Sequence, residues 1–343
     1  MKFGLLVSAL ATSLLSTGVA AAQAATGVIL NGPFPDELNG SNFTYPYPVK
    51  VFKFSVQQQE LQMAFMDIKP SCKPNGKTAV LLHGKNFCGP TWGGQIKALT
   101  GAGWRVIAPD QIGFCKSTKP ANFQFSLSQL AWNTRGLLNT LSIGNVTVIG
   151  HSLGGMLSTR FSLQYADSVD RLVLVDPIGL EDYVQKGVPY ISIDDNIKQE
   201  ASSTFASIKG YEQQFYYVGQ WQPSYDVWVN MLVNIYNGPQ RNNYIKNQGQ
   251  IVDLVLTQPI APFFKDLKPK TLLIVGDKDA TAIGQWAPPA VLATLGHFNV
   301  LGPQVAAQIP RCTLHQFPTL GHAPQISDPT AFNKVLLDWL KTH

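Results

Sequence analysis

Short apolar runs recur along the chain, separated by longer segments with helical periodicity. The runs have the composition of buried strands and cover residues 49–56, 61–68, 78–82, 105–108, 146–149, 172–175, 271–275 and 313–317. The first two are expected to pair as antiparallel opening strands. Helical patterns fall between later runs, for example at 127–141, 153–166 and 331–340. This alternation predicts an α/β fold in which crossover helices join parallel strands of one sheet. Residues 26–48 are rich in Pro, Gly and Asn and predict an irregular lead-in.

The segment between Asp176 and Leu272 is far too long for one crossover helix, so residues 180–262 are expected to be an insertion. It divides a core made of residues 25–179 and 263–343. Eight of the 11 tyrosines lie between Tyr183 and Tyr244. Aromatic residues at this density indicate either a pocket for an apolar substrate group or a small helical unit that packs with aromatics. The candidates for pocket lining are Tyr216, Tyr217 and Trp221.

Residues 1–24 have the pattern of a cleaved signal peptide. Met1-Lys2 supplies positive charge, residues 3–15 are mostly apolar, and Ala22-Gln23-Ala24 is a small-residue cleavage pattern. Cleavage is expected after Ala24, with Ala22 as the alternative. A membrane anchor is the weaker interpretation because the apolar stretch is short and contains Ser and Thr. No later segment has the pattern of a transmembrane helix, so the mature protein is expected to be exported, either periplasmic or secreted, without stable membrane insertion.

Net charge argues against one class of partner. The chain carries a formal charge of +5, spread without a dense Lys/Arg cluster, so nucleic-acid binding is not expected. A small molecule is the expected partner, and the oligomeric state stays open.

Export determines how the cysteines are interpreted, because disulfides persist outside the cytosol. The chain has four of them, at Cys72, Cys88, Cys115 and Cys312, which allow three pairings that sequence alone does not separate. There is no C-x-x-C motif and no histidine cluster with zinc spacing. No metal site is therefore predicted.

The segment Gly150-His151-Ser152-Leu153-Gly154 lies between a predicted strand and a predicted helix. A serine on such a turn has its hydroxyl held clear of the backbone, and glycines on both sides remove bulk. The N-terminus of the helix offers N–H groups to a developing oxyanion. Ser152 is therefore the candidate nucleophile.

A serine nucleophile needs a base and an orienting carboxylate. Among the six histidines, His322 lies on a turn after the last predicted strand, in Gly321-His322-Ala323-Pro324. The strand at 271–275 is followed by two candidate acids, Asp277 and Asp279. The order serine, aspartate, histidine is the one expected of a triad on a sheet of this kind.

Together these segments resemble the α/β-hydrolase superfamily over nearly everything after residue 45. The matching segments occur in the family's order and are His83-Gly84, residues 109–113, residues 150–155, residues 276–279, and Gly321-His322. The resemblance implies an eight-stranded, mostly parallel sheet with a helical cap formed by the insertion.

Carried over residue by residue, the resemblance makes Ser152 the nucleophile, His322 the base and Asp279 the acid. Asp277 fits the spacing less well, and Asp176 is a fallback because some relatives place the acid there. The oxyanion donors would be the backbone N–H groups of Leu153 and of the region around Lys85.

The resemblance also bears on the cysteines. Cys88 and Cys115 follow neighbouring strands of this fold, so a Cys88–Cys115 disulfide is implied. A Cys72–Cys312 pairing is then the remaining possibility, although the strands that follow these two cysteines should lie far apart in the sheet.

The predicted activity is hydrolysis of carboxylic esters or lactones through an acyl-enzyme, without a cofactor. Medium-chain acyl substrates are expected, and acyl-homoserine lactones are a further option because some capped relatives open them. Haloalkane dehalogenases and epoxide hydrolases are similar in loops and cap, but they use Asp where this chain has Ser152. Prolyl aminopeptidase and cofactor-free haloperoxidase activities remain alternatives. A non-catalytic binding protein is disfavoured because all three triad residues are present.

Overall fold

A nine-stranded sheet forms the centre of the protein in a computed structural model that describes residues 24–343. The strand order is β1-β2-β3-β5-β4-β6-β7-β8-β9. The strands are β1 (Gly27–Asn31), β2 (Val49–Val56), β3 (Gln59–Ile68), β4 (Thr78–Leu82), β5 (Arg105–Pro109), β6 (Val146–His151), β7 (Val169–Val175), β8 (Lys270–Gly276) and β9 (Cys312–Phe317). β4 to β9 pair in parallel, while β1, β2 and β3 pair antiparallel and join the rest through β5.

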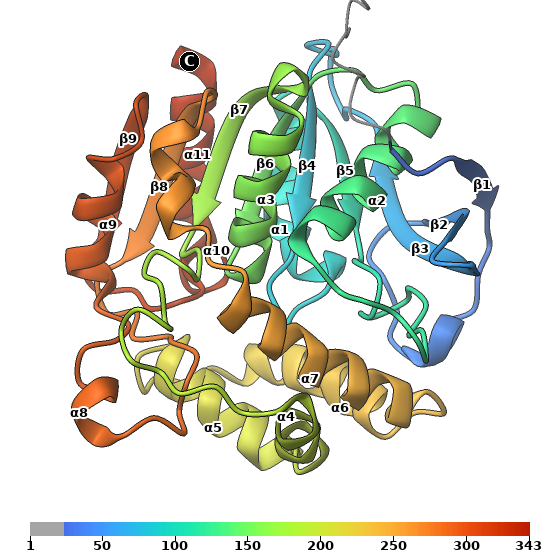
Figure 1. Ribbon diagram of the computed structural model, residues 1–343. Coiled ribbons are helices and arrows are strands. Elements are labelled where there is room, and N and C mark those ends of the chain that lie inside the picture. The colour runs from blue at the N-terminus through green and yellow to red at the C-terminus, as the bar shows by residue number, and fades with distance from the viewer. Residues whose placement is uncertain (1–23) are drawn as a thin grey trace, which may run out of the picture.

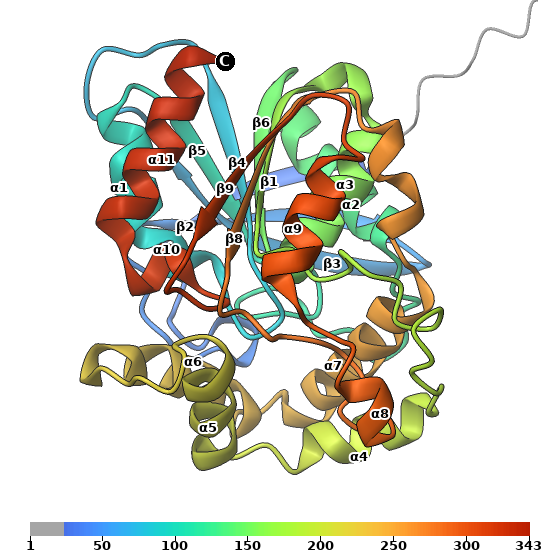
Figure 2. The same ribbon diagram turned by 90° about the vertical axis from the view of Figure 1, so that its left-hand side faces the viewer.

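Helices cover both faces of this sheet (Figures 1 and 2). One face carries α1 (Gly93–Gly101) and α11 (Pro329–Thr342), and the other carries α2 (Leu127–Thr140), α3 (Leu153–Gln164) and α9 (Phe298–Ala306). Helices pack on both faces because successive side chains of the strands point alternately into two hydrophobic clusters, one on each face of the sheet. Leu172 and Leu174 of β7 pack on the α3 side, whereas Val173 and Val175 pack on the α11 side. Burial on both faces is why the parallel strands appear in the sequence as continuous apolar runs.

A separate helical layer lies beyond the carboxyl ends of the parallel strands (Figure 1). It consists of α4 (Ile193–Ala201), α5 (Phe205–Phe215), α6 (Asp226–Tyr236) and α7 (Arg241–Thr257). Both views also place α8 (Pro289–Leu292), from the loop after β8, beside these helices. α10 (Pro324–Ser327) follows β9 and precedes α11. We call α4 to α7 the cap helices.

The lead-in differs from the expectation. Residues 26–48 were expected to be irregular throughout, but residues 27–31 form β1 and pair with β2, from Gly27 opposite Phe54 to Asn31 opposite Lys50. This edge strand is held by main-chain pairing while its side chains stay largely in solvent, with Val28 56% exposed. Its apolar run is only three residues long, from Val28 to Leu30, and lies in a segment whose Pro, Gly and Asn content indicates a loop, so the sequence pattern did not predict a strand. The sheet consequently has one strand more than expected.

The expected signal peptide, residues 1–24, falls almost wholly outside the described residues. Within residues 24–343, no helix has the length and apolarity needed to cross a membrane.

Candidate active site

Ser152 lies on a sharp turn between β6 and α3, with a positive φ of 56° and ψ of −121°. Two glycines allow this turn. A Cβ on Gly150 would collide with the Ser158 hydroxyl, and one on Gly154 would collide with the Leu82 carbonyl. Close contact between α3 and the strands therefore requires glycine on either side of the serine. Backbone strain at a buried serine is a feature of sites where a side chain must be presented in one orientation.

His322 and Asp279 form a direct buried pair. Nδ1 of His322 lies 2.6 Å from Oδ2 of Asp279, and both side chains are fully buried. Oδ1 of Asp279 accepts the Thr281 N–H at 2.8 Å. Nε2 of His322 has no hydrogen-bond partner in the structure. Because burial lowers the pKa of His322 to about 3, the imidazole is neutral at neutral pH, as a general base must be.

Asp277, the competing acid, is turned elsewhere. Its carboxylate accepts a hydrogen bond from Nε2 of Gln316 at 2.7 Å, and it makes no contact with His322. Of the two aspartates after β8, Asp279 is therefore the one that the structure brings to the histidine.

Asp176, the fallback acid at the end of β7, lies beside Asp279 as a second buried carboxyl group. It accepts the Gly276 N–H at 2.7 Å, and its other oxygen has no donor. Burial raises the pKa of Asp176 well above its usual value, and the charge of Asp279 raises it further. Burial also raises the pKa of Asp279, but the N–H of Thr281 and a hydrogen bond from Asp176 act in the opposite direction. Because two adjacent buried carboxylates do not both ionise, these opposite effects on the two pKa values indicate that Asp176 is the protonated member of the pair.

His83 and His151 hold the surrounding loops. Nε2 of His151 lies 2.6 Å from the carbonyl oxygen of His322, which fixes the backbone of the candidate base. Nε2 of His83 accepts the Gln111 N–H at 3.0 Å, which ties the loop after β4 to the loop after β5. Burial lowers the pKa of both histidines, so both stay neutral.

The two candidate oxyanion donors lie on opposite sides of the serine in sequence. Leu153 is the first residue of α3, so its N–H has no partner within the helix. The loop after β4 passes directly against the nucleophile, since a Cβ placed on Gly84 would lie 2.9 Å from Cβ of Ser152. The backbone of Lys85 follows immediately.

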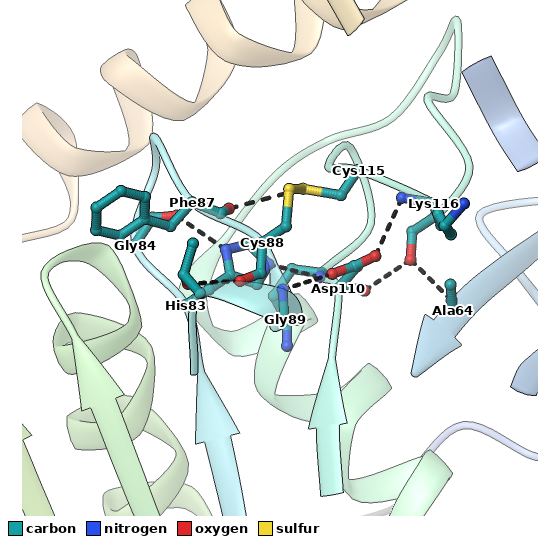
Figure 3. The surroundings of a disulfide bond; sticks show 12 residues. Ala64, His83, Gly84, Phe87, Cys88, Gly89, Asp110, Cys115 and Lys116 are labelled. Atoms are coloured by element: carbon teal, nitrogen blue, oxygen red, sulfur yellow. Dashed lines mark hydrogen bonds between the residues drawn. A yellow bond between two sulfur atoms is a disulfide. The ribbon is translucent and has the colours of Figure 1, made fainter. Parts of the chain in front are cut away.

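A disulfide joins Cys88 to Cys115, the pairing that the family resemblance implied (Figure 3). Both cysteines are fully buried. Asp110 supports the same junction, because its carboxylate accepts the N–H of Gly89 from one loop at 2.9 Å and the N–H of Lys116 from the other at 3.0 Å. The bridge thereby fixes the loop that carries Lys85 to its neighbour.

The remaining cysteines are separate. Cys72 is exposed, Cys312 is partly buried, and the two are not joined. Within the described residues, the grouping of potential metal ligands is Cys88, Asp110 and Cys115. Its sulfur atoms are bonded to each other, so they are not available as thiolate ligands for a metal ion.

A cavity of about 280 Å³ opens above Ser152, between the sheet and the cap helices. Its lining is part apolar and part polar. The polar part includes Lys85, Asn86, Gln199, Glu200, Ser203, Ser207 and Gln285, and the apolar part includes Ile178, Ile208, Leu232, Val252, Ile283 and Trp286.

Only one of the three predicted pocket residues lines this cavity. Tyr216 does so, and its hydroxyl accepts a hydrogen bond from Asn86 at 3.1 Å. Tyr217 instead stacks on Tyr225, with ring centroids 3.8 Å apart, and Trp221 donates its ring N–H to Asp226. Both pack inside the cap, which is the second of the two roles considered for its aromatic residues.

Sequence reasoning missed the polar wall formed by Gln199 and Glu200 at the end of α4 and by Ser203 just after it. This helix is mostly polar, so nothing in its pattern distinguishes a residue facing a cavity from one facing solvent. The lining loop at 281–286 could have been suggested by its position just after Asp279, as Lys85 was by the family resemblance.

The family model of the α/β hydrolase fold matches residues 79–329. This range extends from β4 to the start of α11 and includes Ser152, Asp279 and His322. The chain belongs to the α/β-hydrolase family. This α/β-hydrolase is 45% identical to a probable hydrolytic enzyme from Pseudomonas aeruginosa PAO1, whose crystal structure superposes with a TM-score of 0.86. The match covers 93% of this chain and 99% of that one.

Two further comparisons concern proteins whose reactions are named. The α/β-hydrolase is 27% identical over 272 residues to a 2-hydroxy-6-oxo-6-phenylhexa-2,4-dienoate hydrolase from Burkholderia cepacia, covering 77% of this chain and 88% of the relative. It shares its fold with an enol-lactonase from Burkholderia xenovorans LB400 at a TM-score of 0.60 and 18% identity, covering 82% of this chain and 97% of that one. Hydrolysis is the reaction named for both of these proteins.

Proposed function

We propose that this α/β-hydrolase is a serine hydrolase that cleaves carboxylic esters or lactones through an acyl-enzyme on Ser152. The observation that carries the proposal is the buried His322–Asp279 contact of 2.6 Å, which leaves Nε2 of a neutral imidazole without a partner. That arrangement leaves Nε2 free to take a proton at the sheet edge that also carries the strained turn of Ser152, as a general base for a serine nucleophile must be.

In the proposed reaction, Oγ of Ser152 attacks the substrate carbonyl while Nε2 of His322 takes the hydroxyl proton. The carbonyl oxygen becomes an oxyanion, which the N–H groups of Leu153 and Lys85 stabilise. Collapse of this intermediate breaks the bond to the leaving alcohol, and His322 returns the proton to it. Water, deprotonated by His322, then attacks the acyl-enzyme. The bond to Oγ of Ser152 breaks, His322 returns the proton to Oγ, and the acid is released. Asp279 orients the imidazole and stabilises its protonated form in both half-reactions.

The aminopeptidase alternative would need an unpaired acid in the pocket to hold the substrate amine. Among the lining residues, Glu200 is the acid that faces the cavity, and it is paired with Lys85 at 2.6 Å. The acidic pairs Glu181-Asp182 and Asp194-Asp195 do not line the cavity. This distribution favours a neutral substrate over an amine.

We also propose that the enzyme works outside the cytosol. The leader pattern of residues 1–24 motivates this, and a buried disulfide beside the active site supports it because such bonds persist in oxidising compartments.

The proposal is tested by measuring rates of hydrolysis of p-nitrophenyl esters from acetyl to decanoyl and rates of ring opening of lactones. The expected result is activity that rises from acetyl to medium chains, by up to about 0.8 kcal/mol per buried methylene until the cavity is filled. Ser152→Ala serves as the control and should abolish hydrolysis. A panel without any hydrolysis, or with activity confined to aminoacyl amides, would contradict it.

A further inference from the structure

An ion pair lines the same cavity as Ser152 and has no role in the reaction described above. Nζ of Lys85 lies 2.6 Å from Oε1 of Glu200, and the other carboxylate oxygen of Glu200 accepts the Tyr236 hydroxyl at 2.6 Å. Lys85 comes from the loop after β4, Glu200 from α4 and Tyr236 from α6. The two charged side chains are only 19% and 12% exposed.

Stability does not explain why such a pair is present. Removing two charges from water costs free energy that their attraction often fails to recover, and apolar residues of similar size would pack this wall at least as well. The pair also faces a cavity rather than a packed interior. These two facts indicate a binding role.

Unused hydrogen-bonding capacity defines what this wall can bind. The ammonium group of Lys85 has three N–H donors, of which the ion pair uses one, and each oxygen of Glu200 can accept a further hydrogen bond. The cavity therefore presents a donor and an acceptor side by side.

Charge then narrows the choice of ligand. A substrate carboxylate at this wall would be repelled by Glu200, and a substrate ammonium by Lys85. A plain alkyl chain would cover both charges without replacing their hydrogen bonds to water. A primary carboxamide satisfies both groups, because its carbonyl and one of its N–H groups lie on the same edge. The carbonyl accepts from Lys85 while that N–H donates to Glu200.

We propose that Lys85 and Glu200 form a subsite for a neutral amide of the substrate. The preferred substrates are then esters or lactones that bear a primary carboxamide near the scissile carbonyl, with their apolar part against lining residues such as Ile208 and Leu232. This inference rests on the proposed serine hydrolase activity and adds a determinant of specificity to it. Asn86 and Tyr216, which are hydrogen-bonded to each other, extend the polar wall.

Two p-nitrophenyl esters of equal chain length test the subsite, namely the succinamate ester, which ends in a primary carboxamide, and the pentanoate ester. The measured quantity is the ratio of their kcat/KM values, and comparison of variants with wild type cancels the difference in intrinsic reactivity. In Lys85→Met/Glu200→Leu, the ratio should fall roughly 10- to 100-fold, as expected for the loss of hydrogen bonds to charged groups. Glu200→Gln, which keeps the size of the side chain, should shift the ratio in the same direction by a smaller factor.

Lys334→Met is the matched control, because it removes a lysine whose ion pair with Asp338 is exposed on α11. Its ratio should equal that of wild type. If both substrates lose the same factor in the double variant and in Glu200→Gln, the pair acts only as a structural contact between loop and cap, and the subsite is refuted. A hemisuccinate ester hydrolysed faster than the amide ester would also refute it. Failure of the wild type to hydrolyse any of these esters would instead count against the serine hydrolase proposal.

Discussion

Asp279 contacts His322 directly, with 2.6 Å between Oδ2 of the aspartate and Nδ1 of the imidazole. The two residues are 43 positions apart and follow neighbouring parallel strands, β8 and β9. Parallel strands bring their carboxyl ends to one edge of the sheet, and Ser152 follows β6 at that edge. The strand order therefore brings the loops of Asp279 and His322 together, and the contact between them is the reason to propose Asp279 as the acid.

Asp279→Asn should cut kcat by about 10⁴-fold, because an amide holds the imidazole in the wrong tautomer and does not stabilise its protonated form. Asp277→Asn is the matched control, as it changes the same group two residues away where the partner is Gln316. It should retain nearly all activity. Steady-state kinetics with one ester is sufficient, and the opposite ranking would move the acid to Asp277.

Asp176→Asn should have a small effect on kcat, in contrast to Asp279→Asn. The raised pKa of Asp176 keeps its carboxyl protonated, and asparagine is a neutral group of the same shape that also donates a hydrogen bond to Asp279. Asp176→Leu removes that donor and should be the more damaging change. Equal losses in both variants would mean that the ionised form of Asp176 is the one required.

The same residue predicts a pH dependence of stability. Because the folded pKa of Asp176 is above its unfolded value, its contribution to stability is fully present below about pH 4 and is lost as pH rises through the raised pKa. Asn does not titrate. In denaturant unfolding, the free energy of unfolding of Asp176→Asn should therefore rise relative to that of wild type as pH rises. Parallel plots of this free energy against pH would contradict the assignment.

The sequence was most informative where burial or chemistry constrains residue type. Buried strands such as β7 are continuous apolar runs, and the turn around Ser152 tolerates only glycine at Gly150 and Gly154. Edge strand β1 escaped prediction because its apolar run is short and lies in a segment rich in Pro, Gly and Asn. The Lys85–Glu200 pair joins residues 115 positions apart, one of them on a polar helix, so only the tertiary structure reveals it. Tyr217 and Trp221 show that composition located the aromatic cap without locating its cavity.

Cys88→Ser/Cys115→Ser should lower the free energy of unfolding by about 2–4 kcal/mol, since the bridge closes a loop across a separation of 27 residues. Because the bridge also anchors the loop that carries Lys85, kcat should fall more in this double variant than in a variant of the unpaired Cys72. Cys72→Ser is the control. Full activity in the double serine variant would show that Asp110 holds the two loops by itself.

Activity should persist into mildly acidic solution. Since burial lowers the pKa of His322, protonation that inactivates the base begins only well below the ordinary histidine range. The acidic limb of kcat/KM should therefore have its midpoint below about 6.5. A limb at or above that value would mean that His322 titrates as an exposed imidazole.

The central claim is that Ser152 is a nucleophile activated by His322, and covalent labelling with a fluorophosphonate tests it most directly. Intact mass and peptide mapping should find one adduct per chain, located on Ser152, and His322→Ala should slow its formation by orders of magnitude. Absence of an adduct, an adduct on another serine, or labelling that proceeds equally fast without His322 would contradict the account.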